Sequence, residues 1–132
     1  MARELSRFST TKPAGTSLTT KQYTFVKLNS SGQVIACSAT TDVPYGILQN
    51  APGSLQPALV MRDGISRLVF GGSIATGANM LGTDGAGKGT LHAAGAGGTV
   101  AYPVGFVEEG VNVADLIGTV DIDCTGAPKR AF

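Results

Sequence analysis

The sequence predicts an all-β protein, and three features carry that prediction: the distribution of glycine, the length of the apolar runs and the shortage of charge. The chain has 132 residues, and its 19 glycines are spread along the whole length. They divide the apolar residues into runs that are too short for helices but suit strands. Only 14% of the residues are charged, well below the roughly 25% typical of soluble domains. We expect one small β-barrel or β-tulip-like domain whose weakly charged surface is readily covered by a partner.

The N-terminal residues 1–20 are expected to form an extended arm ahead of a single β domain at 21–132. The arm is rich in Ser, Thr, Lys and Arg, and its sizeable apolar residues are Leu5, Phe8 and Leu18. This composition favours a segment that either stays mobile or orders against another surface, for example as an added edge strand. A simple frayed terminus explains the same composition equally well.

Seven runs within the β domain have strand length, β-branched or aromatic enrichment and turn residues on either side. They are 23–28, 34–37, 45–48, 58–61, 65–70, 104–107 and 116–122. Asn29-Ser30-Ser31-Gly32 predicts a β-hairpin between the first two runs, and Asp63-Gly64 predicts another between the fourth and fifth.

Residues 71–99 form a glycine-rich excursion between the fifth and sixth runs. We expect one irregular hairpin between Thr90 and Val100. The only helical candidate is a short turn around 76–81. Because no segment has a sustained apolar period of 3.6 residues, at most one or two helical turns are expected in the whole chain.

Charge is unevenly distributed although the formal net charge is only +1. Residues 1–30 carry five basic side chains against Glu4 alone, a balance of +4, whereas residues 108–123 carry five carboxylates and no basic residue, a balance of −5. The simpler interpretation is two solvated faces. The alternative is head-to-tail or symmetric association, in which a basic arm of one subunit meets an acidic edge of the next. The low net charge disfavours sequence-independent nucleic-acid binding.

The candidate chemical motifs are weak. Residues 82–89 nearly match a phosphate-binding loop, but Gly89 stands where Ser or Thr would bind magnesium, so a flexible loop is the better interpretation. His92 is the only candidate general base with a pKa near neutrality, and no nucleophile motif accompanies it. Cys37 and Cys124 are too few for a zinc site or a disulfide scaffold and are expected to be small buried residues. We therefore expect no catalytic residue, no metal and no cofactor.

The N-terminus lacks the apolar stretch of a secretory signal, and no apolar run approaches the length of a membrane span. We expect synthesis in a cytoplasm and no membrane association.

Several segments resemble a family of small phage and prophage proteins known as capsid cement or decoration proteins. They are 25–28, 32–37, 41–50, 64–69, 77–88 and 103–107, within a match of roughly residues 20–122. The resemblance rests on glycines and apolar positions. It implies a domain that clusters, with a trimer favoured, on the outside of an icosahedral head, braces neighbouring major-capsid subunits and carries no catalytic residue. The tail 128–132 has no counterpart in the family pattern.

These observations together predict a non-enzymatic structural virion protein, synthesised in the host cytoplasm, on the outer capsid surface. Its expected partners are the major capsid protein and further copies of itself. The candidate capsid contacts are Arg3, Leu5, Arg7, Phe8, Lys12 and Leu18. The candidate inter-subunit contacts are Glu108, Glu109, Asp115, Lys21 and Lys27.

A carbohydrate- or receptor-binding β module is the alternative. Glycan sites generally use exposed aromatic platforms, and the chain has three Tyr, five Phe and no Trp. A small hydrolase using His92 is a third hypothesis.

Overall fold

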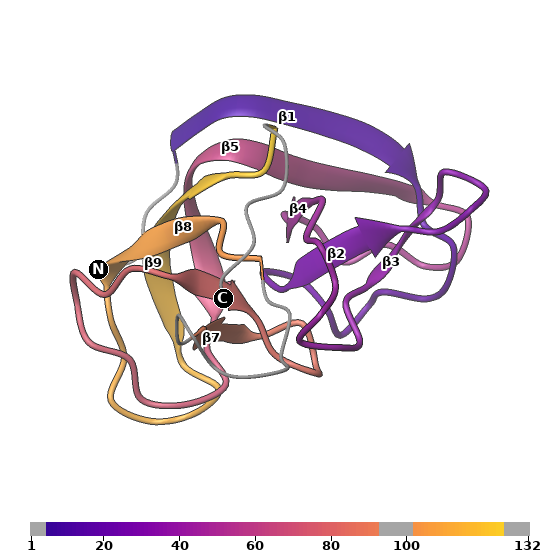
Figure 1. Ribbon diagram of the computed structural model, residues 1–132. Coiled ribbons are helices and arrows are strands. Elements are labelled where there is room, and N and C mark those ends of the chain that lie inside the picture. Colours follow the sequence, from indigo (N-terminus) through magenta and orange to yellow (C-terminus); the bar gives the residue numbers. More distant parts are fainter. Residues whose placement is uncertain (1–4, 93–101, 126–132) are drawn as a thin grey trace.

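The short apolar runs of the sequence become the strands of one curled antiparallel sheet. The computed structural model describes residues 5–92 and 102–125, and Figure 1 gives the strand labels. The strands are β1 (Leu5–Pro13), β2 (Phe25–Leu28), β3 (Val34–Ala36), β4 (Gly46–Leu48), β5 (Pro57–Val69), β6 (Leu81–Thr83), β7 (Gly89–Leu91), β8 (Gly105–Glu109) and β9 (Ile117–Asp123). The described residues contain no helix, so the all-β prediction is confirmed.

The 13-residue strand β5 organises the sheet. The strand order is β3-β2-β4-β5-β9-β8-β6-β7, and β1 pairs with β5 outside this path. Met61 of β5 aligns with Ser9 of β1 and with Ile47 of β4, whereas Ile65 aligns with Leu5 of β1 and with Asp121 of β9. Strands β4 and β9 therefore share one edge of β5, and β1 covers the other.

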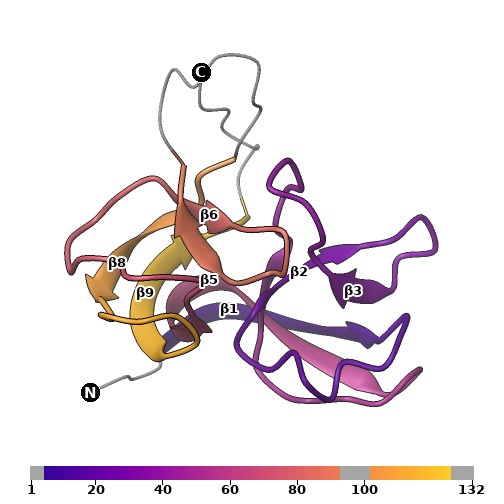
Figure 2. The ribbon, with the colours of Figure 1, turned by 90° about the horizontal axis from the view of Figure 1, so that it is seen from below.

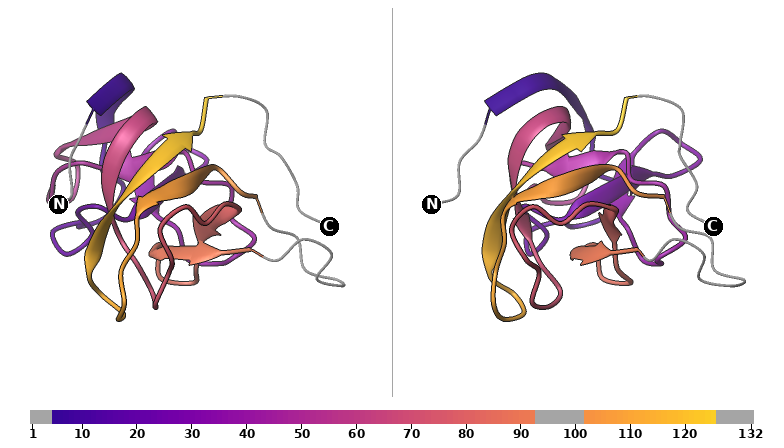
Figure 3. Two further views of the ribbon diagram at one scale, coloured as in Figure 1. Left: turned by 90° about the vertical axis from the view of Figure 1, so that its left-hand side faces the viewer. Right: turned by 60° about the vertical axis from the view of Figure 1, so that its left-hand side comes forward.

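The sheet curls until its last strand meets the end of β5. Phe70, directly after β5, bridges to Gly89 of β7, and the Gly71 amide donates to the Gly89 carbonyl at 3.0 Å. Figure 3 shows β8 and β9 curving side by side around the hairpin of β6 and β7. Figure 2 shows this half beside the smaller half that contains β2 and β3, with β1 and β5 extending across both.

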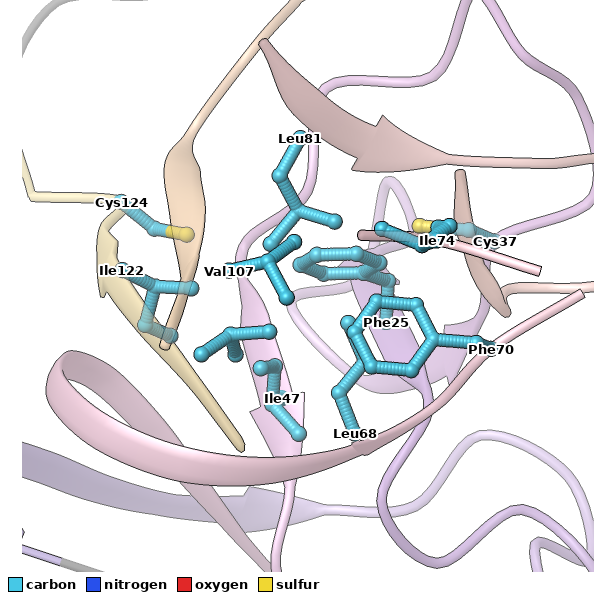
Figure 4. Packing of buried hydrophobic residues seen from close by; sticks show 11 residues of the cluster. Phe25, Cys37, Ile47, Leu68, Phe70, Ile74, Leu81, Val107, Ile122 and Cys124 are labelled. Carbon is cyan, nitrogen blue, oxygen red and sulfur yellow. The ribbon is translucent and has the colours of Figure 1, made fainter. Parts of the chain in front are cut away.

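Two apolar clusters fill the fold, and strands β2 and β4 lie between them. Neighbouring residues of a strand point to opposite faces. Phe25 and Ile47 accordingly enter the larger cluster, whereas Val26 and Leu48 enter the smaller one. Phe25 and Phe70 lie next to each other in the larger cluster, where Ile122 and Val107 also pack (Figure 4).

The N-terminal segment orders against the chain's own sheet. Residues 5–13 form β1, and the residues that follow enter the smaller cluster: Ala14 is fully buried, and the Leu18 amide donates to the Pro52 carbonyl at 2.9 Å. This segment therefore contributes both an outer strand and part of a core.

Of the two hairpins predicted from the sequence, one forms and the other does not. The hairpin at 29–32 is confirmed: the Asn29 amide donates to the Gln33 carbonyl at 2.9 Å, and Gly32 has a φ of 75°. The hairpin at Asp63-Gly64 is wrong, because β5 runs through both residues. Gly64 is needed for another reason, since a Cβ there would lie 2.4 Å from the Leu5 carbonyl oxygen of β1.

The glycine-rich excursion contains a hairpin, but earlier in the chain than predicted. Strands β6 and β7 pair across the turn 84–88, whereas most of the predicted hairpin at 90–100 lies outside the described residues. The helical turn around 76–81 does not form. Gly77 and Met80 have φ values of 83° and 62°, which are incompatible with a right-handed helix, and Leu81 begins β6.

Candidate interaction surfaces

Strand β1 presents the most exposed apolar side chains of the sheet. None of its nine residues is buried, and Leu5 and Phe8 are 61% and 47% exposed. Within the part of the chain that the structure describes, β1 pairs with β5 alone, which leaves the backbone of its other edge available. An unpaired strand edge with apolar neighbours is a ready site for a partner.

Arg7 fastens β1 across two strands. The register between β1 and β5 shifts between Ser6 and Phe8, the step that contains Arg7, and the Arg7 guanidinium reaches Asp63 of β5 at 2.9 Å and Asp121 of β9 at 2.8 Å. Hydrogen bonds to Asp63 and then to Asp121 raise the pKa of Arg7 above its ordinary value. A basic residue of the arm thus meets an acidic residue of 108–123 within one chain.

The other candidate capsid contacts differ in accessibility. Lys12 is half-buried and lines a hollow with Thr11, Pro13, Leu55 and Pro57. Leu18 is only 1% exposed and packs in the smaller cluster, so it stabilises the fold and does not reach the surface. Arg3 lies outside the described residues.

Two of the candidate inter-subunit residues already have partners in the same chain. Asp115 forms an ion pair with Lys88, and the Lys27 ammonium lies 3.0 Å from a carboxylate oxygen of Asp42. Burial raises the pKa of Asp42, but hydrogen bonds from the Ser38 amide and from Lys27 outweigh it, so the net pKa is lowered.

The remaining inter-subunit candidates are only partly accessible. Glu108 and Glu109 of β8 and Lys21 before β2 are half-buried. Glu109 also belongs to the lining of a surface groove between β8 and β9.

Two features that sequence reasoning missed lie at opposite ends of β5. Near its start, Leu55 is 70% exposed with a positive φ of 66°, and we call this residue the Leu55 knob. Near its end, a groove of about 440 Å³, here the β8–β9 groove, is lined by Glu109, Gly110, Val111, Asn112, Leu116, Ile117 and Gly118. The sequence does contain a signal for the knob, which is a leucine placed among turn residues in Pro52-Gly53-Ser54-Leu55-Gln56-Pro57.

The chemical candidates have structural roles. The carboxylate of Asp84 accepts the amides of Ala86 and Lys88 at 2.8 and 2.9 Å, so the backbone donors of a phosphate loop are already used. His92 is buried with its ring against Gly82, and burial lowers its pKa.

Metal and glycan chemistry find little support in the described residues. Cys37 and Cys124 are free and buried, and burial raises the pKa of each to about 12. No group of three or more His, Cys, Asp or Glu that could hold a metal ion occurs among residues 5–92 and 102–125.

The aromatic face of Tyr45, a candidate platform for a glycan, is covered by a cation, because the Arg62 guanidinium lies 4.0 Å from the centre of the Tyr45 ring. None of the described segments is a helix with the length and hydropathy needed to span a membrane.

The comparisons with known proteins concern the fold. The sequence matches no protein-family model and no curated protein. Among solved structures, the chain is similar to the N base of the head fiber protein gp8.5 of bacteriophage phi29, with a TM-score of 0.65 and 14% sequence identity. The likeness covers 91% of this chain and 97% of that chain. It therefore establishes that this all-β fold, over nearly its whole length, also occurs in the base of a phage head fiber.

Proposed function

We propose that the protein is a non-enzymatic structural component of a phage virion that decorates the outside of an icosahedral head and braces neighbouring major-capsid subunits. Two independent lines support the proposal. The sequence resembles capsid decoration proteins, and the fold is similar to the base of a phage head fiber over nearly the whole of both chains. Oligomeric copies, with a trimer favoured by the resemblance, would bind several capsid subunits at once, so that modest affinities multiply.

The observation that carries the contact itself is the exposure of β1. Leu5 and Phe8 point outward although they belong to a paired strand, and they contribute nothing to either apolar cluster. Covering such side chains stabilises a complex by roughly 25 cal/mol for each Å² of apolar surface removed from water. The available edge of β1 adds backbone groups that an extended capsid segment can pair with.

Co-sedimentation with empty heads tests this proposal. Empty heads assembled from candidate phage major capsid proteins are used, and the double variant Leu5→Ser, Phe8→Ser is compared with the native protein. We expect the native protein to pellet with the heads and the variant to lose most of that binding while its unfolding midpoint stays close to native, because both side chains are exposed.

Val43→Ser is the matched control, because Val43 is an exposed apolar residue outside β1. It is expected to bind like the native protein. Undiminished binding of the double variant would exclude β1 as the contact, and failure of the native protein to bind heads would refute the decoration role.

A further inference from the structure

The Leu55 knob has a conformation that stability alone does not favour. Its side chain is 70% exposed, so it contributes little to the core, and its positive φ of 66° is strained for a residue other than glycine. Strained backbone at an exposed apolar residue points to a contact made by that residue.

The loop around the knob holds it in place. The Leu55 amide donates to the carbonyl of Ala14 at 2.9 Å, and Ala14 is itself fully buried. The Gln56 side chain accepts the Gly53 amide at 2.7 Å, while the Gln56 amide donates to the Gly53 carbonyl at 3.1 Å. The leucine is therefore presented on an ordered loop, and little conformational entropy is lost when it is bound.

The β8–β9 groove has room for an apolar side chain and exposes apolar residues of its own. Leu116 and Ile117 are exposed members of its lining, and its volume of about 440 Å³ is ample for one leucyl side chain. Val113, in the same connection between β8 and β9, is also exposed. Apolar side chains thus gather around an open hollow.

The two ends also carry opposite charge. Among residues 5–92 and 102–125, Lys12 is the one charged residue that lines the hollow beside Leu55, and Glu109 is the one charged residue that lines the β8–β9 groove. Joining the two ends would bring a base toward an acid around an apolar contact, which favours correct over incorrect pairing.

A single chain cannot join its own two ends. Pro57 at the start of β5 aligns with Pro13, and Val69 at its end aligns with Ile117 of the groove. Figures 1 and 2 show the loop before β5 and the connection between β8 and β9 on opposite sides of the molecule.

We propose that the Leu55 knob of one copy inserts into the β8–β9 groove of the next copy, with Lys12 of the first near Glu109 of the second. Such a contact is heterologous, so it closes into a ring or continues as a filament according to the rotation between copies. The proposal does not depend on the capsid role, because it concerns copies of this chain alone.

Directed cross-linking of the full chain tests the pairing. Leu55→Cys and Ile117→Cys are made in separate chains, and the two are mixed under mild oxidation. Both native cysteines are buried and do not compete. We expect a cross-linked dimer in the mixture and no cross-link in either variant alone, because only the mixture places the two new thiols in one interface. Val43→Cys, at another exposed apolar residue, replaces Leu55→Cys as the matched control and should give no product.

Light scattering of the unmodified protein supplies the second measurement. The native chain should have a mass above that of a monomer, and Leu55→Asn should be monomeric, because asparagine tolerates this backbone conformation while lacking the apolar side chain. A native chain that stays monomeric at every concentration tested would overturn the proposal. So would cross-linking of Leu55→Cys with itself, or a Leu55→Asn chain that remains oligomeric.

Discussion

Strands β1 and β9 both pair with β5, on opposite edges, yet they have very different environments. β9 buries Gly118, Thr119, Val120 and Ile122, whereas β1 buries none of its residues. Backbone pairing alone therefore does not make a strand part of the core. β9 lies between β5 and β8 with one face on the larger cluster, so it holds the fold together, whereas β1 is available for a partner.

The largest expected difference between β9 and β1 is the loss of unfolding free energy when an apolar side chain is truncated. Ile122→Ala should lower the free energy of unfolding by about 2–5 kcal/mol, because Ile122 is fully packed in the larger cluster. Phe8→Ala, although it removes a larger side chain, should change it by less than about 1 kcal/mol because Phe8 is half exposed. Urea unfolding of both variants measures this. Equal losses would show that β1 packs as part of the core.

The next prediction concerns the glycine that lets β1 approach β5. Gly64 has a φ of 139°, and a Cβ at this position would lie 2.4 Å from the Leu5 carbonyl oxygen and 2.9 Å from the Arg7 amide nitrogen. Gly64→Ala should therefore lower the free energy of unfolding by about 1–3 kcal/mol and displace the first half of β1.

Amide hydrogen exchange measures the effect of Gly64→Ala on β1 and on β9, the two strands that pair with β5 at Gly64. The amides of β1 should lose protection in Gly64→Ala, whereas those of β9 should keep theirs. Gly72→Ala is the control, because a Cβ there has no heavy atom within 4 Å. Loss of protection in β9 before β1 would contradict the view that β9 belongs to the stable part of the sheet.

The fold class and most strands could be predicted from the sequence, because strand length, β-branched residues and turn residues are local signals. The Asp63-Gly64 prediction failed for a physical reason: the same dipeptide suits a hairpin turn or a point of close approach, and Leu5, 59 residues away in the chain, decides between them. Strands β6 and β7 were missed because each has only three residues within a glycine-rich segment. Their turn depends on the side chain of Asp84, which accepts two backbone amides.

The surfaces were harder to predict than the strands. Sequence reasoning selected Leu5 and Phe8, which are exposed, but also Leu18, which is buried, because composition does not distinguish an outward leucine from an inward one. The partners of Arg7 lie 56 and 114 residues away, so no local pattern could reveal them.

The smallest effect is expected at Arg7, whose ion pairs tie β1 to β5 and to β9. Because its side chain is half exposed, solvent and salt weaken its ion pairs with Asp63 and Asp121. Arg7→Gln should leave global stability almost unchanged while the amides near the start of β1 exchange faster. The same amides should exchange faster in the native protein as salt is raised, and the variant should lose that salt dependence. An equal salt response in both proteins would mean that backbone pairing with β5, and not Arg7, holds the start of β1 in place.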